Sequence, residues 1–287
     1  MHMPRTLKIP GLPVILTTNT KGGSGKTMTA EALAVAAMLA GYLVCVLDLD
    51  PIGSMYKWKS RRRFTQAIAR GQERFGRMPN DSELAALLDE PDPLNEIIVT
   101  PAQAHAIGNS LKILKKGGRN FVIIDTAGSK QNYAEQAAQH ADLVLIPTKT
   151  ATKEIEHLPD TLNQLALGGH PPRFCLFNRV NPLVTTALEK PKQIVRDHYN
   201  TTPFPYHFTT RIIWDEADDM GLTPQELTRD PAAAEEIAHA FAFICDFLNL
   251  PRSTKTDAAD DEHARPDEVA RSKDAGTAAR SSERARA

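Results

Sequence analysis

The sequence predicts an α/β fold, a single domain in which helices flank a mainly parallel central sheet. Short and almost continuously apolar runs alternate with longer segments of helical periodicity, which is typical of parallel sheets covered on both faces. A glycine-rich turn joins the first apolar run to the first helical segment. The chain has 287 residues, of which 41% are hydrophobic, so it can bury a sizeable core.

Six segments are predicted as strands. The first five are short apolar runs bounded by polar or turn residues, and the second and third of them end in aspartate. The sixth has a weaker pattern. In chain order they are Val14–Thr18, Leu43–Asp48, Phe121–Asp125, Leu143–Pro147, Arg173–Asn178 and Tyr206–Thr209.

Helical patterns lie between these strands. The clearest is Thr27–Ala40, rich in Ala, Leu and Met and followed by Gly41, a residue that favours helix ends. Pro231–Leu248 follows Asp230, and an acid cap with proline in the first turn is typical of a helix start. The remaining predicted helices are Ser82–Leu88, Gln131–Gln139, Thr152–Leu167 and Val184–Tyr199.

The pattern predicts that residues 1–250 form the folded domain, with an insertion near residues 79–100. Residues 251–287 carry eight basic and eight acidic side chains and no aromatic one. Such a segment buries too little apolar surface to offset its ordering entropy, so we expect a disordered tail.

Charge and cysteine usage exclude several classes of protein. The net charge of −1 gives no support for a globally basic nucleic-acid binder, although residues 57–77 hold eight basic side chains against one acid. No apolar run is long enough to span a membrane. Cys45, Cys175 and Cys245 lie in separate apolar runs, which favours reduced, buried thiols over a disulfide or metal framework.

The first predicted strand leads into KGGSGKT, residues 21–27. Glycines let the backbone curl with several N–H groups pointing inward, and the following helix N-terminus adds positive potential, so the segment predicts a phosphate-binding loop (P-loop). Lys26 can reach the β- and γ-phosphates of a nucleotide, and the Thr27 hydroxyl can ligate Mg²⁺. The residues expected to contact nucleotide are Gly22, Gly23, Ser24, Gly25, Lys26, Thr27 and Met28.

KGGSGKT, with the extra lysine Lys21, resembles the deviant Walker A motif of the ParA/MinD ATPases. Three further stretches are similar to this family. The resemblance covers most of residues 11–250 and is nearest to the small partition ATPases. The three stretches are Leu47–Ser54, similar to D-x-D-P-Q-G-S of switch I, Phe121–Gly128, similar to Walker B and switch II, and Asp142–Thr148.

Chemistry and resemblance together assign roles to three acids. An acid that ends a strand beside a P-loop is well placed to hold Mg²⁺, and Asp125 fits that position. The resemblance implies that Asp50 positions the attacking water and that Asp48 supports the metal. The alternative for each is an acid that caps the following helix.

The resemblance also implies roles for Lys21 and Asn178. Lys21 would cross to the partner subunit's nucleotide in an ATP-sandwiched homodimer and act in catalysis with Lys26 and Asp50. Asn178 would recognise adenine, with an ordinary strand-end turn as the alternative. Two residues depart from the family: Ile52 stands in place of the usual switch glutamine, and Met28 in place of a hydroxyl residue, which leaves only its backbone N–H for the α-phosphate.

Partition ATPases bind DNA nonspecifically through scattered Lys and Arg, and this chain offers two basic groups. The first group is residues 57–77, and its three alternative interpretations are DNA binding, contact with a partner, and a solvated helix face. The resemblance favours the second group as the DNA-binding one. The second group is Arg179, Lys190, Lys192, Arg196 and Arg211.

The sequence therefore predicts a Mg²⁺-dependent ATPase whose ATP-bound dimer binds DNA and drives plasmid or chromosome partition. We expect a ParB-like centromere-binding protein that stimulates hydrolysis, a cytoplasmic and nucleoid-associated location, and no membrane binding. One alternative is a related ATPase that positions a protein cargo or assists conjugative DNA transfer. An alternative of another class is a small-molecule kinase or ligase of the same superfamily.

Overall fold

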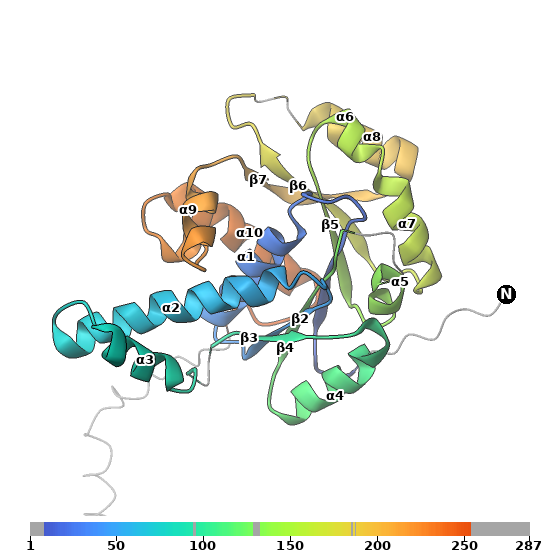
Figure 1. The fold of residues 1–287 in the computed structure, drawn as a ribbon. Coiled ribbons are helices and arrows are strands. Elements are labelled where there is room, and N and C mark those ends of the chain that lie inside the picture. Colours follow the sequence, from blue (N-terminus) through green and yellow to red (C-terminus); the bar gives the residue numbers. More distant parts are fainter. Residues whose placement is uncertain (1–8, 94–95, 129–132, 185, 187, 254–287) are drawn as a thin grey trace, which may run out of the picture. The chain divides into compact units, whose positions relative to one another are not determined.

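The computed structural model describes residues 9–93, 96–128, 133–184, 186 and 188–253. Seven strands form one sheet in the order β3-β2-β4-β1-β5-β6-β7, and every pairing is parallel (Figure 1). The predicted α/β class is confirmed. The strands are β1 (Val14–Thr17), β2 (Val44–Asp48), β3 (Ile98–Pro101), β4 (Phe121–Asp125), β5 (Leu143–Thr148), β6 (Arg173–Val180) and β7 (Thr202–Thr209).

Helices cover both faces of this sheet. They are α1 (Lys26–Leu39), α2 (Ser54–Phe75), α3 (Asp81–Asp89), α4 (Ile107–Lys116), α5 (Tyr133–Ala138), α6 (Thr152–Ile155), α7 (Leu158–Leu167), α8 (Glu189–Tyr199), α9 (Ile213–Asp219) and α10 (Pro231–Phe247), with short 3₁₀ turns at Ala104–Ala106 and Pro224–Glu226. None of the described helices has both the length and the apolar character needed to cross a bilayer.

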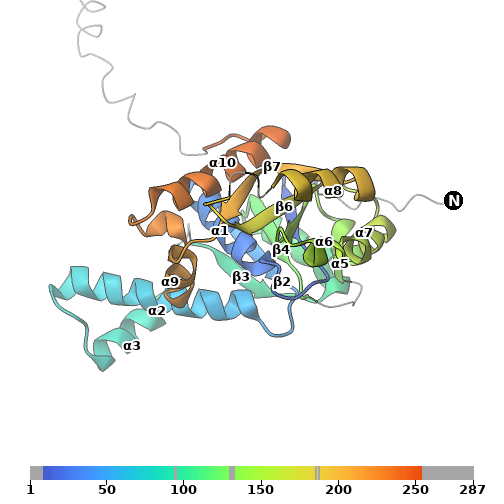
Figure 2. The same ribbon diagram turned by 90° about the horizontal axis from the view of Figure 1, so that it is seen from above.

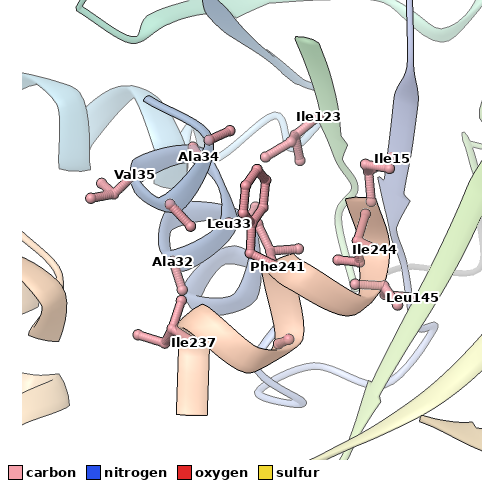
Figure 3. Packing of buried hydrophobic residues seen from close by; sticks show 14 of the residues in the cluster. Ile15, Ala32, Leu33, Ala34, Val35, Ile123, Leu145, Ile237, Phe241 and Ile244 are labelled. Carbon is pink, nitrogen blue, oxygen red and sulfur yellow. The ribbon is translucent and has the colours of Figure 1, made fainter. Parts of the chain in front are cut away.

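The hydrophobic core has two layers, one on each face of the sheet. On β1, Ile15 packs into one layer, whereas Val14 and Leu16 pack into the other, as the two-residue period of a strand requires. Figure 3 shows the first layer, in which Phe241 and its neighbours on α10 lie against α1 and the strands. Because β1 is apolar on both faces, it lies in the interior of the sheet.

Several elements differ from the sequence predictions. The predicted Thr152–Leu167 helix is divided into α6 and α7, since Pro159 favours a new helix start. α8 begins at Glu189 rather than Val184. Of the predicted Gln131–Gln139 helix, residues 131–132 lie outside the described residues, as do residues 254–287 of the predicted tail. α2, β3, α4 and α9 were not predicted, and the side chains of edge strand β3 are only partly buried or exposed.

The basic run at residues 57–77 lies on α2, and intramolecular ion pairs neutralise most of it. Arg62 is 1% exposed and binds Glu96 (2.8 Å) and Glu226 (2.7 Å). Helices α2 and α3 run side by side beyond the β3 edge of the sheet (Figures 1 and 2). Segment 79–100, which contains α3, therefore supplies many of the acids that pair with the other basic side chains of α2. The other pairs are Lys59–Asp92, Arg61–Asp218, Arg63–Asp92, Arg70–Glu90, Arg74–Glu90 and Arg77–Glu83.

Replacing Arg62 is expected to destabilise the fold strongly, because it leaves two carboxylates without their buried partner. We predict that Arg62→Ala lowers the free energy of unfolding by about 3–5 kcal/mol. Arg74→Ala, which removes a half-exposed ion pair, is the matched control and should cost about 0–1 kcal/mol. Urea denaturation of both variants measures the difference, and equal losses would contradict the structural role given to Arg62.

Candidate functional site

The candidate site lies where β1, β2 and β4 end and α1 begins. Strand register places Thr17 of β1 and Asp48 of β2 on either side of Asp125 of β4. The P-loop follows β1, and α1 starts at Lys26 after Gly25, whose φ of 95° is a left-handed conformation that glycine tolerates. The parallel sheet thus brings three separate chain segments to one edge.

Polar side chains from elsewhere in the fold hold the P-loop in place. Asn19 accepts a hydrogen bond from the backbone N–H of Lys21 (2.9 Å) and donates to the carbonyl of Pro147 (2.8 Å). Thr161 on α7 accepts from the backbone N–H of Thr20 (3.0 Å). Sequence reasoning missed both Asn19 and Thr161, since their contacts depend on the packing of β5 and α7.

The loop itself presents unused hydrogen-bond donors. Within the described part of the chain, the backbone N–H groups of Gly22–Gly25 donate no hydrogen bond, and the buried hydroxyl of Ser24 has no partner. The Lys26 ammonium donates to the carbonyl of Lys21 (3.1 Å), and burial lowers the pKa of this lysine. Unpaired donors beside a largely buried cation fit a group with several anionic oxygens, such as a polyphosphate.

Asp125 is fully buried at the end of β4 and accepts two hydroxyl hydrogen bonds. The donors are Thr27 at 2.8 Å and Thr17 at 3.1 Å. Burial raises the pKa of Asp125 to about 7, and nearby Asp48 raises it further, while the Thr27 hydrogen bond and Lys26 oppose the shift. A carboxylate and a hydroxyl in contact fit Mg²⁺, which takes a few protein oxygens together with phosphate and water.

Asp48 and Asp50 both organise the segment that joins β2 to α2. Asp48 accepts from the backbone N–H of Asp50 (3.0 Å) and of Tyr56 (3.2 Å), and burial raises its pKa. Asp50 accepts from the backbone N–H of Ile52 (2.9 Å) and is partly exposed. The alternative role for these two acids was to cap the helix that follows them, and such contacts with the loop and the helix start are present. Both acids nevertheless belong to the segment that lies beside Asp125.

Asn178 lies against the P-loop. Its side-chain amide donates to the carbonyl of Ser24, while its carbonyl oxygen is buried and has no hydrogen-bond partner among the described residues. A Cβ on Gly25 would lie 2.3 Å from the Asn178 amide nitrogen, so the two residues are in direct contact. Gly128, which sequence reasoning missed, approaches the loop in the same way, since a Cβ there would lie 2.9 Å from the Gly22 Cα.

The basic residues expected to bind DNA do not form one group. Arg211 is paired with Asp230 (3.1 Å) and Glu236 (3.3 Å), and Arg179 lies 3.9 Å from Asp215. α8 carries the other three, Lys190, Lys192 and Arg196, which make no ion pair with the described residues. Lys21 is partly exposed, and its ammonium likewise makes no ion pair there.

The contact between Gly25 and Asn178 predicts a difference between two glycines of the loop. Gly25→Ala adds a collision to an unfavourable backbone conformation, whereas Gly23→Ala, at φ 66°, has no atom within 4 Å of the new Cβ. Gly23→Ala should therefore cost only the backbone term of about 1–2 kcal/mol, and Gly25→Ala clearly more. Chemical denaturation of the two variants checks this, and equal losses would show that Asn178 does not constrain the loop.

Comparison with known proteins places this arrangement in a family. A family model described as ATPase MipZ matches residues 13–157. Maintenance of carboxysome distribution protein A from Gloeobacter kilaueensis is 28% identical over 170 residues, 59% of this chain and 64% of that protein. Protein ParA from Rhizobium radiobacter is 28% identical over 138 residues, 48% of this chain and 49% of that protein. The matched segments thus span less than two thirds of either relative.

A solved structure has the same fold. It is a Borrelia burgdorferi protein, described as a plasmid partition protein and bound to AMPPNP, with a TM-score of 0.57 and 16% identity over 81% of this chain and 99% of that one. The family model covers half of the present chain and includes the P-loop, Asp48, Asp50 and Asp125. The chain therefore belongs to the MipZ family of ATPases, within the ParA/MinD group of P-loop proteins.

Proposed function

We propose that this protein is a Mg²⁺-dependent ATPase of the ParA type that drives plasmid or chromosome partition. The observation that carries the proposal is the convergence of Lys26, Thr27 and Asp125 on a loop with unpaired N–H donors. The similarity to a curated ParA protein supports the partition role. Residues 1–250 are proposed to act as one ATPase domain.

The P-loop residues would hold the nucleotide. Backbone N–H groups of Gly22–Met28 would bind the phosphates, and Lys26 would leave the Lys21 carbonyl to contact the β- and γ-phosphates. Thr27 and Asp125 would hold Mg²⁺, with Asp48 in support. The metal would neutralise charge that develops on the phosphates. Asn178 supports this site by fixing the Ser24 carbonyl, and it would also recognise the adenine of the bound nucleotide.

Catalysis would need a second copy of the chain. Asp50 would orient the attacking water. The ammonium of Lys21, which has no ion pair among the described residues, would reach the partner's nucleotide and stabilise negative charge, as an arginine finger does. Three large apolar side chains support a dimer across this edge of the sheet. They follow β2, β6 and β7 and are Ile52 (69% exposed), Leu183 (88%) and Ile212 (78%).

DNA binding would rest mainly on α8. Lys190, Lys192 and Arg196 are free to contact phosphates, whereas Arg211 and most of the α2 basic run already have acidic partners. Arg179 would contribute less, because Asp215 lies beside it. Nonspecific DNA binding of this kind would associate the ATP-bound dimer with the nucleoid. A ParB-like protein would stimulate ATP hydrolysis and so release the ATPase from the DNA.

A second candidate function is the positioning of a protein cargo by the same ATPase cycle. The similarity to a curated protein named for the maintenance of carboxysome distribution favours it. Both functions would use nucleotide-dependent attachment to a surface. They would differ only in the cargo and in the partner that stimulates hydrolysis. ATP hydrolysis by this protein, measured with and without a centromere-binding protein encoded beside it, would distinguish the two functions. Stimulated hydrolysis would support partition, and unchanged hydrolysis would favour a protein cargo.

Three variants are expected to separate binding from catalysis. Lys26→Ala should abolish ATP binding and turnover, because the phosphates lose their buried cation. Lys21→Ala and Asp50→Ala should bind ATP with affinity close to wild type and hydrolyse it on the order of 10²–10³-fold more slowly. Calorimetry and phosphate release measure the two properties. Unchanged turnover in Lys26→Ala, or lost ATP binding in Asp50→Ala, would contradict the assigned roles.

DNA co-sedimentation tests the proposed interface. With ATP, the triple variant Lys190→Ala, Lys192→Ala, Arg196→Ala should bind DNA weakly, and its negative slope of log affinity against log salt should be smaller in magnitude by about 3. The control is Arg70→Ala, Arg74→Ala, Arg77→Ala, which removes paired cations and should leave DNA binding near wild type. Equal binding of the wild type with ATP, with ADP and without nucleotide would refute nucleotide-dependent DNA binding.

A further inference from the structure

A cavity of about 340 Å³ adjoins the P-loop between α1, α2 and α9. Thr27 and Met28 form its wall on the P-loop side, and α2 and α9 close the other sides. Its volume is at the lower end of the range found for small-molecule sites. The charged side chains around it are mostly paired: Arg61 binds Asp218 (2.5 Å), and Arg179 lies 3.9 Å from Asp215.

Glu31 is the buried exception in this cavity; the exposed Lys57 also lines it and likewise makes no ion pair with the described residues. Glu31 lies one helical turn after Thr27 on α1 and is only 6% exposed, and its carboxyl makes no hydrogen bond or ion pair with the described residues. Burial raises the pKa of its carboxyl well above the usual range, Asp218 and Asp125 add to the shift, and Arg61 opposes it. A carboxyl on a residue so little exposed, which lines a cavity and has no partner among the described residues, points to a hydrogen-bond partner supplied by a ligand.

The position of the P-loop limits what that ligand can be. The inference rests on the proposed function, in which the backbone N–H of Met28 meets the α-phosphate of the nucleotide. The ribose is bonded directly to this phosphate and must lie next to Met28. Met28 lines the cavity that contains Glu31 and a second cavity of only about 50 Å³, beside Arg179 and Trp214. Of these two, the larger has room for a sugar and an unpaired group to bind it.

We propose that this cavity takes the ribose of the bound nucleotide and that Glu31 determines sugar specificity by hydrogen bonding to a ribose hydroxyl. A hydroxyl suits this carboxyl in either protonation state, because it donates to a carboxylate and accepts from a carboxylic acid. Met28, Trp214 and Leu222 supply apolar surface for the sugar ring. The side chain would then be satisfied only when nucleotide is bound.

Calorimetry on the full chain with ADP and with 2′,3′-dideoxy-ADP tests the assignment. The wild type should bind ADP about tenfold more tightly, the usual effect of a hydrogen bond to an ionisable group. In Glu31→Leu, the ratio of the two dissociation constants should fall to about one, and Glu31→Gln should retain part of it. Glu235→Gln, the same change at an exposed position on α10, is the control and should keep the tenfold ratio.

The ratio is measured within each variant, so partial unfolding does not alter it. Wild-type protein that binds both nucleotides equally would overturn the assignment, as would a Glu31→Leu variant that keeps the tenfold preference. In both cases nucleotide binding itself, and with it the proposed function, would stand. Failure of the wild type to bind either nucleotide would instead remove the proposed function and this inference together.

Discussion

The burial of the Asp125 carboxyl is the constraint on which the rest of the site depends. The group has no exposure to water, so its two oxygens must be satisfied by side chains, and Thr17 and Thr27 do this. The first contact requires β1 and β4 to pair in their observed register, and the second requires α1 to begin directly after the P-loop. Lys26 then lies near enough to oppose the rise in the pKa of Asp125. Sheet register, helix start and electrostatics are thus linked through one side chain, which explains why this strand end is suited to a metal and phosphates.

A segment that is basic in sequence does not necessarily have cations that are free to bind a ligand. The α2 segment is strongly basic in sequence, yet its cations are held by acids from segment 79–100 and from the region around Asp218 and Glu226. The pairing gives segment 79–100 a structural role, since it supplies counter-charges that keep α2 and α3 together. It also agrees with placing the proposed DNA interface on α8, whose cations have no such partners among the described residues. Net charge alone, at −1, would have given no indication of either feature.

Sequence reasoning succeeded where the signal is local. The apolar runs predicted six of the seven strands, and KGGSGKT predicted the loop, its glycines and the start of α1 within one residue. It failed where the structure depends on distant segments. β3 is a short edge strand whose apolar run is only three residues long, residues 97–99, and Asn19, Thr161 and Gly128 acquire their roles only after β5, α7 and β4 are packed. The same holds for Glu31, which reads in the sequence as an ordinary helical acid and is distinguished only by the cavity beside it.

A crystal structure with AMPPNP and Mg²⁺ tests the central claim most directly, because the claim concerns which atoms meet the phosphates. The account predicts phosphate oxygens against the backbone N–H groups of Gly22–Gly25, with the Lys26 ammonium moved from the Lys21 carbonyl to the phosphates. The metal should lie at the Thr27 hydroxyl, on the Asp125 side of the loop. Phosphates bound elsewhere, or a Lys26 ammonium still on the Lys21 carbonyl with nucleotide present, would contradict it.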